Sequence, residues 1–140
     1  MTDLEIAIRV SRWQQTLAAL GISHWDFEID VQVDPVGGPF DDRIGAVTSL
    51  INDKYDRVEF TFDKESIPAV VNDEFDSYIV HEWLHVALRD YDKAIHAVSG
   101  MMGADAYRLW QDRLDHEEEG IVERLAQLIV SLYNPKDVVQ

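Results

Sequence analysis

Cysteine is absent from the 140-residue chain, and positively charged residues are scarce. Without thiols the chain can form neither a disulfide nor a thiolate metal site, so any metal must be bound by His, Asp or Glu. Only 12 Lys and Arg oppose 27 Asp and Glu, which gives a net charge of −15. This charge argues against binding to nucleic acid and to anionic membranes, because phosphates need clustered basic residues. A cationic substrate or partner would be attracted, although the charge also serves solubility.

Long apolar runs are lacking as well. None reaches the roughly 18 residues of a membrane span, and no apolar segment with a cleavage site opens the chain, so we expect no membrane insertion. Together with the absence of cysteine, this favours a cytoplasmic location. Hydrophobic residues make up 46% of the chain and include four Trp, a composition that is typical of a globular protein. The length predicts a single domain, residues 1–140, with one core.

One stretch, Ile79–Leu88, is almost entirely apolar except for His81, Glu82 and His85. These residues form the pattern His-Glu-x-x-His. On a helix the two histidines stand one turn apart on the same face, so both imidazoles can bind one metal ion. Glu82 lies about 100° further round the helix, close enough to reach a metal-bound water without binding the metal. Burying this polar set is costly unless a metal, partner groups or chemistry compensate, so we predict a zinc site.

Before this motif, hydrophobic periodicity predicts one helix and three strands. A stripe with spacings of four and three residues runs from Ile6 to Leu20 and indicates a helix. The following apolar residues alternate with polar ones, which is typical of half-buried strands, and a short turn joins the last two strands as a hairpin. The expected elements are a helix at 4–20 ended by Gly21, a strand at 24–33 with His24 at the surface, a loop at 34–40, a strand at 44–51, a turn from Asn52 and a strand at 58–62.

From Asn72 onward the sequence predicts helices. Asn72 or Asp73 can cap a central, buried helix at about 74–89 that carries the motif. Residues 90–103 are expected to form a loop or a broken helix, and a long helix should follow at about 104–133, with an interruption near Gly120. The predicted class is therefore α+β, with a small sheet of three to four strands. The second half of the last helix should bury one apolar face, formed by Ile121, Val122, Leu125, Leu128, Ile129 and Leu132.

This layout resembles the zincin metallopeptidases of the Glu-zincin type, and most closely the small, uncharacterised zincin-like proteins of phage and bacterial genomes. The residues that carry the resemblance are His81-Glu82-Trp83-Leu84-His85 and, in the following helix, Glu118-Glu119-Gly120-Ile121-Val122-Glu123. The metzincin extension is absent, since Leu88 and Tyr91 stand where its Gly and third His would be. The resemblance covers the layout of about residues 25–132, and only its first motif is specific.

The resemblance implies a minimal zincin-like fold and a zinc-dependent hydrolase of peptide bonds, with Glu82 as the general base. It also implies that the edge strand nearest the motif helix binds an extended peptide, a role for residues 58–62 or for their hairpin partner. The partner would be a peptide or protein substrate, with basic ones favoured by the charge. Candidates to stabilise the oxyanion of the tetrahedral intermediate are Tyr91, His96, Tyr107 and His116.

The third metal ligand is predicted to be Glu119. Glu118 is an alternative, because helix geometry puts it near the centre of the apolar stripe, where an unpaired carboxylate would be costly. Glu119 instead lies on the flank shared with Ala126, whose small side chain permits close approach of another helix. Glu123, one turn on, could then accept the free N–H of a ligating His, and Glu119-x-x-x-Glu123 resembles the Glu-zincin pattern. His96 and His116 are further alternatives as ligands.

Two other functions compete with peptide hydrolysis. One is a regulatory or interaction protein that keeps the zincin fold and the zinc but has little or no catalytic activity. The presence of Glu82 favours catalysis over it, because a metal-binding scaffold does not need this residue. The other resembles the SprT-type proteases, in which His96 would complete the site, although Ala97 replaces the Gly expected after that His. The nucleic-acid association of that family also fits poorly with a charge of −15.

Overall fold

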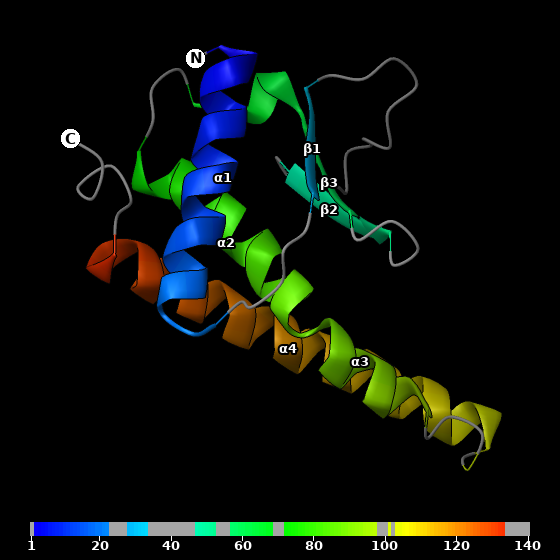
Figure 1. Cartoon of the computed structure of the whole chain (residues 1–140). Coiled ribbons are helices and arrows are strands. Elements are labelled where there is room, and N and C mark those ends of the chain that lie inside the picture. Colours follow the sequence, from blue (N-terminus) through cyan, green and yellow to red (C-terminus); the bar gives the residue numbers. More distant parts are fainter. Residues whose placement is uncertain are drawn as a thin grey trace.

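The computed structural model describes residues 2–22, 28–33, 47–52, 57–68, 72–97, 101 and 103–133. These residues combine helices with a small sheet, as the predicted α+β class requires (Figure 1). The predicted loop at 34–40, the hairpin turn and His24 lie outside the described residues. The elements are α1 (Asp3–Ala19), β1 (Glu28–Val33), β2 (Val47–Asn52), β3 (Arg57–Phe62), the 3-10 helix η1 (Lys64–Ser66), α2 (Asp73–Ala87), α3 (Arg89–His96) and α4 (Ala104–Leu132).

Helix α1 begins and ends where the sequence predicts. Thr2 accepts a hydrogen bond from the backbone N–H of Glu5, whose side chain in turn accepts one from the N–H of Thr2. At the other end Gly21 adopts a φ of 77°, a conformation that glycine reaches without steric cost. The predicted stripe is buried except for its last member, Leu20. The buried members are Ile6, Val10, Trp13 and Leu17.

The sheet has the strand order β1-β3-β2, with β1 parallel and β2 antiparallel to β3. The antiparallel pairing agrees with the predicted hairpin, and Val58, Phe60 and Phe62 of β3 are fully buried. The order corrects one expectation, since residues 58–62 form the central strand and have no free edge. The reason is that residues 28–33 return to pair alongside β3, a long-range contact that strand patterns do not encode.

Helix α2 lies at the centre of the fold and packs against α1, β2 and α4 (Figure 1). Asn72 caps it by accepting a hydrogen bond from the backbone N–H of Phe75, which settles the choice between Asn72 and Asp73. Seven of its 15 side chains are buried, which fits the prediction of a central, buried helix. The buried apolar residues of α2 are Phe75, Ile79, Val80, Trp83, Leu84 and Val86.

A buried ion pair joins α1 to α2. Asp76 is inaccessible to solvent, and its carboxylate accepts two hydrogen bonds of 2.8 Å from the guanidinium of Arg9. The indole N–H of Trp13 donates a third bond to the same carboxylate, at 3.1 Å. Nearby, the indole N–H of Trp83 donates to the backbone carbonyl of Val10. These bonds fix the register of α1 on the side of α2 that faces away from the motif histidines.

Helix α3 agrees with the expectation, and helix α4 differs from it in two respects. Residues 89–96 form a helix that is separated from α2 at Leu88, which is the broken-helix alternative expected for residues 90–103. Helix α4 continues without a break through Gly120. Its buried face, which packs on the side of α2, is also shifted from the predicted one. Val122, Ala126, Ile129 and Val130 are buried, whereas Ile121, Leu125, Leu128 and Leu132 are exposed.

The small side chain of Ala126, which is fully buried, is consistent with this shift. A buried alanine at the contact allows two helix backbones to approach closely, whereas a stripe of leucines would hold them apart. The first half of α4 extends beyond α2 and runs beside α3 (Figure 1). None of the described helices, α4 included, has the length and apolarity needed to cross a membrane.

Candidate metal centre

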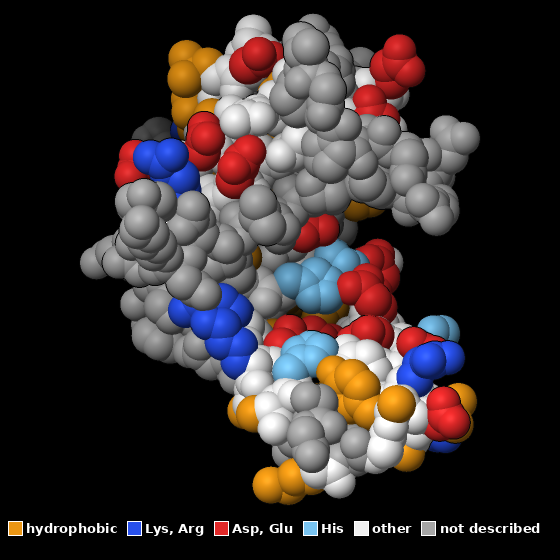
Figure 2. All heavy atoms as spheres, turned by 90° about the vertical axis from the view of Figure 1, so that its right-hand side faces the viewer, with side chains coloured by type: hydrophobic (Ala, Val, Ile, Leu, Met, Phe, Trp, Pro, Cys, Tyr) orange, Lys and Arg blue, Asp and Glu red, His pale blue; other side chains and the backbone are white. Residues whose placement is uncertain are grey.

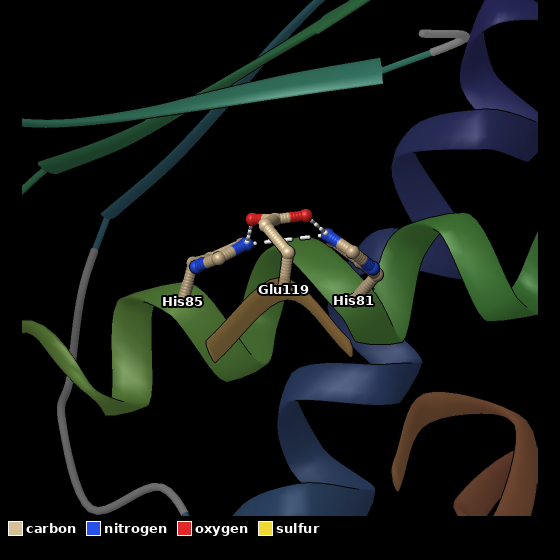
Figure 3. Close-up of side chains that lie close together, drawn as sticks. All are labelled: His81, His85 and Glu119. Atoms are coloured by element: carbon tan, nitrogen blue, oxygen red, sulfur yellow. Dashed lines mark hydrogen bonds and ion pairs between the residues drawn. The ribbon is translucent and has the colours of Figure 1, made fainter. Parts of the chain in front are cut away.

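Three of the predicted ligands meet between α2 and α4 (Figure 3). The Nε2 atoms of His81 and His85 lie 3.2 Å apart, as the one-turn spacing of the motif requires. The carboxylate of Glu119 reaches over both rings, with one oxygen 2.5 Å from Nε2 of His85 and the other 3.2 Å from Nε2 of His81. The described residues thus form one group of three side chains able to hold a metal ion.

The donor set and its spacing fit zinc. Ligand atoms bound to tetrahedral zinc at about 2.1 Å lie about 3.4 Å from one another, so the observed separations need only small side-chain adjustments. Neutral imidazole and carboxylate are ordinary zinc ligands, and three protein donors leave one position for water or substrate. The group is also open to solvent on one side, since Glu119 is 56% exposed while the two histidines are mostly covered.

Each histidine is backed by a second carboxylate on its other ring nitrogen. Glu123 lies 2.8 Å from Nδ1 of His81, and its other oxygen accepts a hydrogen bond from Gln127. Glu118 lies 3.6 Å from Nδ1 of His85, an ion-pair contact that is too long for a hydrogen bond. At His81 the bond to Glu123 keeps the proton on Nδ1, which leaves the lone pair of Nε2 free for a metal.

Glu118 and Glu119, the two candidates for the third ligand, therefore occupy different places. Glu118 is the more buried, as the helix geometry predicted, but it faces the Nδ1 side of His85 rather than the Nε2 side. Glu119 lies on the flank that contains Ala126, and it faces both Nε2 atoms. The direction in which α4 packs, rather than the centre of its apolar arc, decides which carboxylate reaches the histidines.

The electrostatics around the site are strongly acidic. Burial raises the pKa of Glu118 from 4.5 to about 7, helped by a side-chain hydrogen bond with Asp92 and by the charges of Asp92, Asp115 and Glu119. At Tyr78 a hydrogen bond with Glu74, burial and the charges of Glu74 and Glu123 raise the pKa of the phenol. Figure 2 shows histidine and acidic side chains gathered in the hollowed middle of one face of the molecule.

Apart from Glu82, the remaining candidates lie outside this group in the described structure. Nδ1 of His96 is 2.9 Å from the hydroxyl of Tyr107, and its Nε2 faces Gln111, so this histidine belongs to the α3–α4 contact. His116 and Tyr91 are exposed. Glu82 is half-buried on α2 beside His81. Asp92 was not foreseen as a partner of Glu118, because it comes from a segment expected to be irregular.

Comparison with known proteins adds no identification. Neither protein-family models, nor curated proteins, nor solved structures give a match to this chain. The function must therefore be argued from the residues of the site and their geometry.

Proposed function

We propose that this protein is a zinc-dependent peptidase in which His81, His85 and Glu119 bind the metal and Glu82 is the general base. The observation that carries the proposal is the convergence of two imidazole Nε2 atoms and one carboxylate from two packed helices. Structural zinc sites are usually closed by four protein ligands, whereas catalytic ones use three and leave a position open. The exposed side of Glu119 supports the second arrangement.

The chemistry assigns a role to each side chain. Zinc at this site would act as a Lewis acid and lower the pKa of its bound water to about 7. Glu82 follows His81 on α2, and we assign it the role of taking the proton of the attacking water and returning it to the leaving amine. Glu123 accepts the Nδ1–H of His81 and so holds its ring in the tautomer that binds metal.

Substrate binding is assigned to β2. This strand forms an edge of the sheet and packs against α2, so a peptide that pairs with its outer edge would run close to the motif helix (Figure 1). Main-chain pairing of this kind aligns a scissile carbonyl without requiring a particular sequence. The carboxylates around the site favour peptides with Lys or Arg near the scissile bond.

Elemental analysis of the purified protein is the first test, and we expect about one zinc per chain. His81→Ala and His85→Ala should lose the metal, because two remaining donors rarely hold zinc against water. His96→Ala is the matched control and should keep it, which also tests the SprT-type alternative. A protein that never binds zinc in chelator-free buffer would refute the proposal.

The second test separates catalysis from metal binding alone. Glu82→Gln should retain the zinc and the fold but lose hydrolysis, since the neutral amide cannot accept a proton. Glu117→Gln, an exposed position on α4, provides the matched control and should keep full activity. Cleavage of a mixed peptide library is read by mass spectrometry. Equal cleavage by Glu82→Gln would disprove the general-base assignment, and zinc-loaded protein without any cleavage would favour a non-catalytic zinc protein.

A further inference from the structure

One apolar face of α4 is exposed to solvent. Four large aliphatic side chains lie along the second half of this helix, and each residue is between 41% and 63% exposed. They are Ile121, Leu125, Leu128 and Leu132, which we call the α4 stripe. Figure 1 shows this half of α4, orange to red, along the lower edge of the molecule. Single exposed hydrophobic residues are ordinary, but a continuous row of them on one helix indicates an interaction surface.

The α4 stripe points away from the proposed metal centre. At about 100° per residue, the mean direction of the stripe is turned roughly 150° round the helix from Glu119. It is turned roughly 115° from the buried face that packs on the side of α2. A partner that covers the stripe would therefore leave the three candidate ligands accessible.

The spacing of the α4 stripe is that of a coiled-coil seam. Its members follow one another at intervals of four, three and four residues, so they alternate between the two apolar positions of a heptad. Such a seam is narrower than the face that a helix usually turns to the core of its own domain. It fits an identical seam on another helix, because each side chain enters a hole between side chains of the partner. A second copy of this chain supplies that seam, as a two-fold dimer requires.

The exposed area of the α4 stripe is sufficient for a small dimer interface. At about 190 Å² for a fully exposed Leu or Ile, the four residues together expose on the order of 400 Å². Apolar atoms contribute about 60% of an interface, so this patch corresponds to roughly 650 Å² per partner. The total of about 1,300 Å² exceeds the roughly 1,000 Å² expected of a biological interface and lies near the lower end of the standard size.

The charges beside the α4 stripe are compatible with pairing of two copies. The outer flank of the stripe is formed by three exposed residues, of which one is acidic and one basic. They are Glu117, Arg124 and Ser131. The carboxylates of Glu119 and Glu123 face the motif histidines on the other side of the helix. Repulsion between two chains of charge −15 therefore acts mainly over longer distances, where salt screens it.

We propose that the α4 stripe is a dimer interface, on which a second copy of this chain docks with its own α4 stripe. The two copies are related by a two-fold axis, and the metal centre of each remains open. This inference does not rest on the proposed function, because the stripe and the candidate ligands occupy opposite flanks of α4.

Sedimentation equilibrium of the full chain, from about 5 µM to 1 mM, tests the dimer. We expect the mass of one chain at low concentration and that of two chains at high concentration. Leu125→Glu with Leu128→Glu should weaken self-association by about 100-fold or more, because unpaired charges would be buried. The matched control Ala106→Glu with Leu109→Glu adds the same charge to the exposed first half of α4 and should associate like wild type.

Folding of each variant is verified by circular dichroism at low concentration, where the stripe is exposed and the substitutions remove no core contact. Leu128→Ala is the milder variant and should weaken association by about 10-fold. Higher salt should strengthen association of the wild type, because the two chains repel each other and the seam is apolar. A basic partner protein would instead bind less tightly as salt rises.

A charge-swap experiment tests whether the two stripes contact each other. The variant Leu125→Lys with Leu128→Lys should be monomeric alone, like the corresponding Glu variant. An equimolar mixture of the two should form a mixed dimer, because opposite charges then meet across the seam.

Three results would overturn the inference. They are a wild-type mass of one chain at every concentration, a dimer that persists in the folded Glu variant, and a mixture of Glu and Lys variants that stays monomeric. The first result would mean that no second copy covers the stripe, and the second that the copies meet through another face. Zinc content, measured in parallel, should be equal in wild type and the Glu variant, so loss of zinc in both would refute the proposed function and leave the dimer intact.

Discussion

Arg9→Met should be among the most destabilising single changes in the described structure. The guanidinium of Arg9 donates two of the three hydrogen bonds that compensate the buried carboxylate of Asp76. Met fills a similar volume, but it leaves the Asp76 carboxylate with the indole N–H of Trp13 as its remaining hydrogen-bond donor among the described residues. Breaking one side of a buried ion pair typically costs about 3–5 kcal/mol. The reason is the uncompensated charge that remains, rather than the loss of the pair itself.

Urea unfolding of the metal-free protein measures the effect. With a slope of about 1.5–2 kcal/mol per molar urea, a loss of 4 kcal/mol lowers the midpoint by about 2–3 M. The matched control is Arg57→Met, which breaks an exposed ion pair with Glu28 at 3.4 Å, where a cost of about 0–1 kcal/mol is expected. If Arg9→Met moves the midpoint no further than Arg57→Met, the reasoning about the buried charge is wrong.

The double variant Arg9→Met with Asp76→Leu refines this prediction. It removes both charges, so most of the lost stability should return, because apolar replacements of buried ion pairs are often neutral or stabilising. The free energy of unfolding of the double variant should remain about 1–3 kcal/mol below that of the wild type, since the indole N–H of Trp13 loses its buried acceptor. A double variant as unstable as Arg9→Met would show that packing, not charge, determines the cost.

Two further predictions concern α4 and the acidity of the site. Ala126→Leu should lower the free energy of unfolding by about 1–3 kcal/mol through overpacking, and it should weaken zinc binding by moving Glu119 away from the histidines. The control Ala106→Leu, at an exposed position, should have neither effect. Urea unfolding measures the stability, and competition with a chelator measures the zinc affinity. Burial raises the pKa of Glu118 from 4.5 to about 7, so the folded protein favours the protonated form of this side chain. The contribution of Glu118 to the free energy of unfolding is therefore complete below pH 4.5 and is lost as the pH rises through 7. Glu118→Gln should therefore flatten that part of the pH dependence in thermal unfolding of the metal-free protein, and an unchanged slope would contradict the assignment.

The local features of this protein could be predicted from its sequence because neighbouring residues specify them. The stripe from Ile6 to Leu17, the positive φ of Gly21 and the one-turn spacing of the motif histidines all depend on short-range geometry. The meeting of Glu119 with the histidines joins distant segments, and it was predicted from the small Ala126 on one flank of α4 together with the resemblance of Glu119-x-x-x-Glu123 to the Glu-zincin pattern.

The errors concern contacts between distant segments. An apolar arc on a helix shows what can be buried, but the neighbouring helix decides which part is buried, and so Leu125 and Leu128 are exposed on α4. The central place of β3 depends on the return of β1, which no strand pattern reveals. Asp92 was missed for the same reason, since its partnership with Glu118 exists only because α3 and α4 run side by side.

The division of the ligands between α2 and α4 has a thermodynamic consequence. An ion bound by His81, His85 and Glu119 would link two helices that are 34 residues apart along the chain at their nearest ligands, and it would bind only while they are packed together. Bound metal therefore adds RT ln(1 + [Zn²⁺]/Kd) to the free energy of unfolding, about 4 kcal/mol when free zinc is 1,000 times Kd. The resistance of this protein to unfolding and proteolysis would then rise and fall with the free zinc concentration, so its abundance would follow the metal supply even without a change in its synthesis.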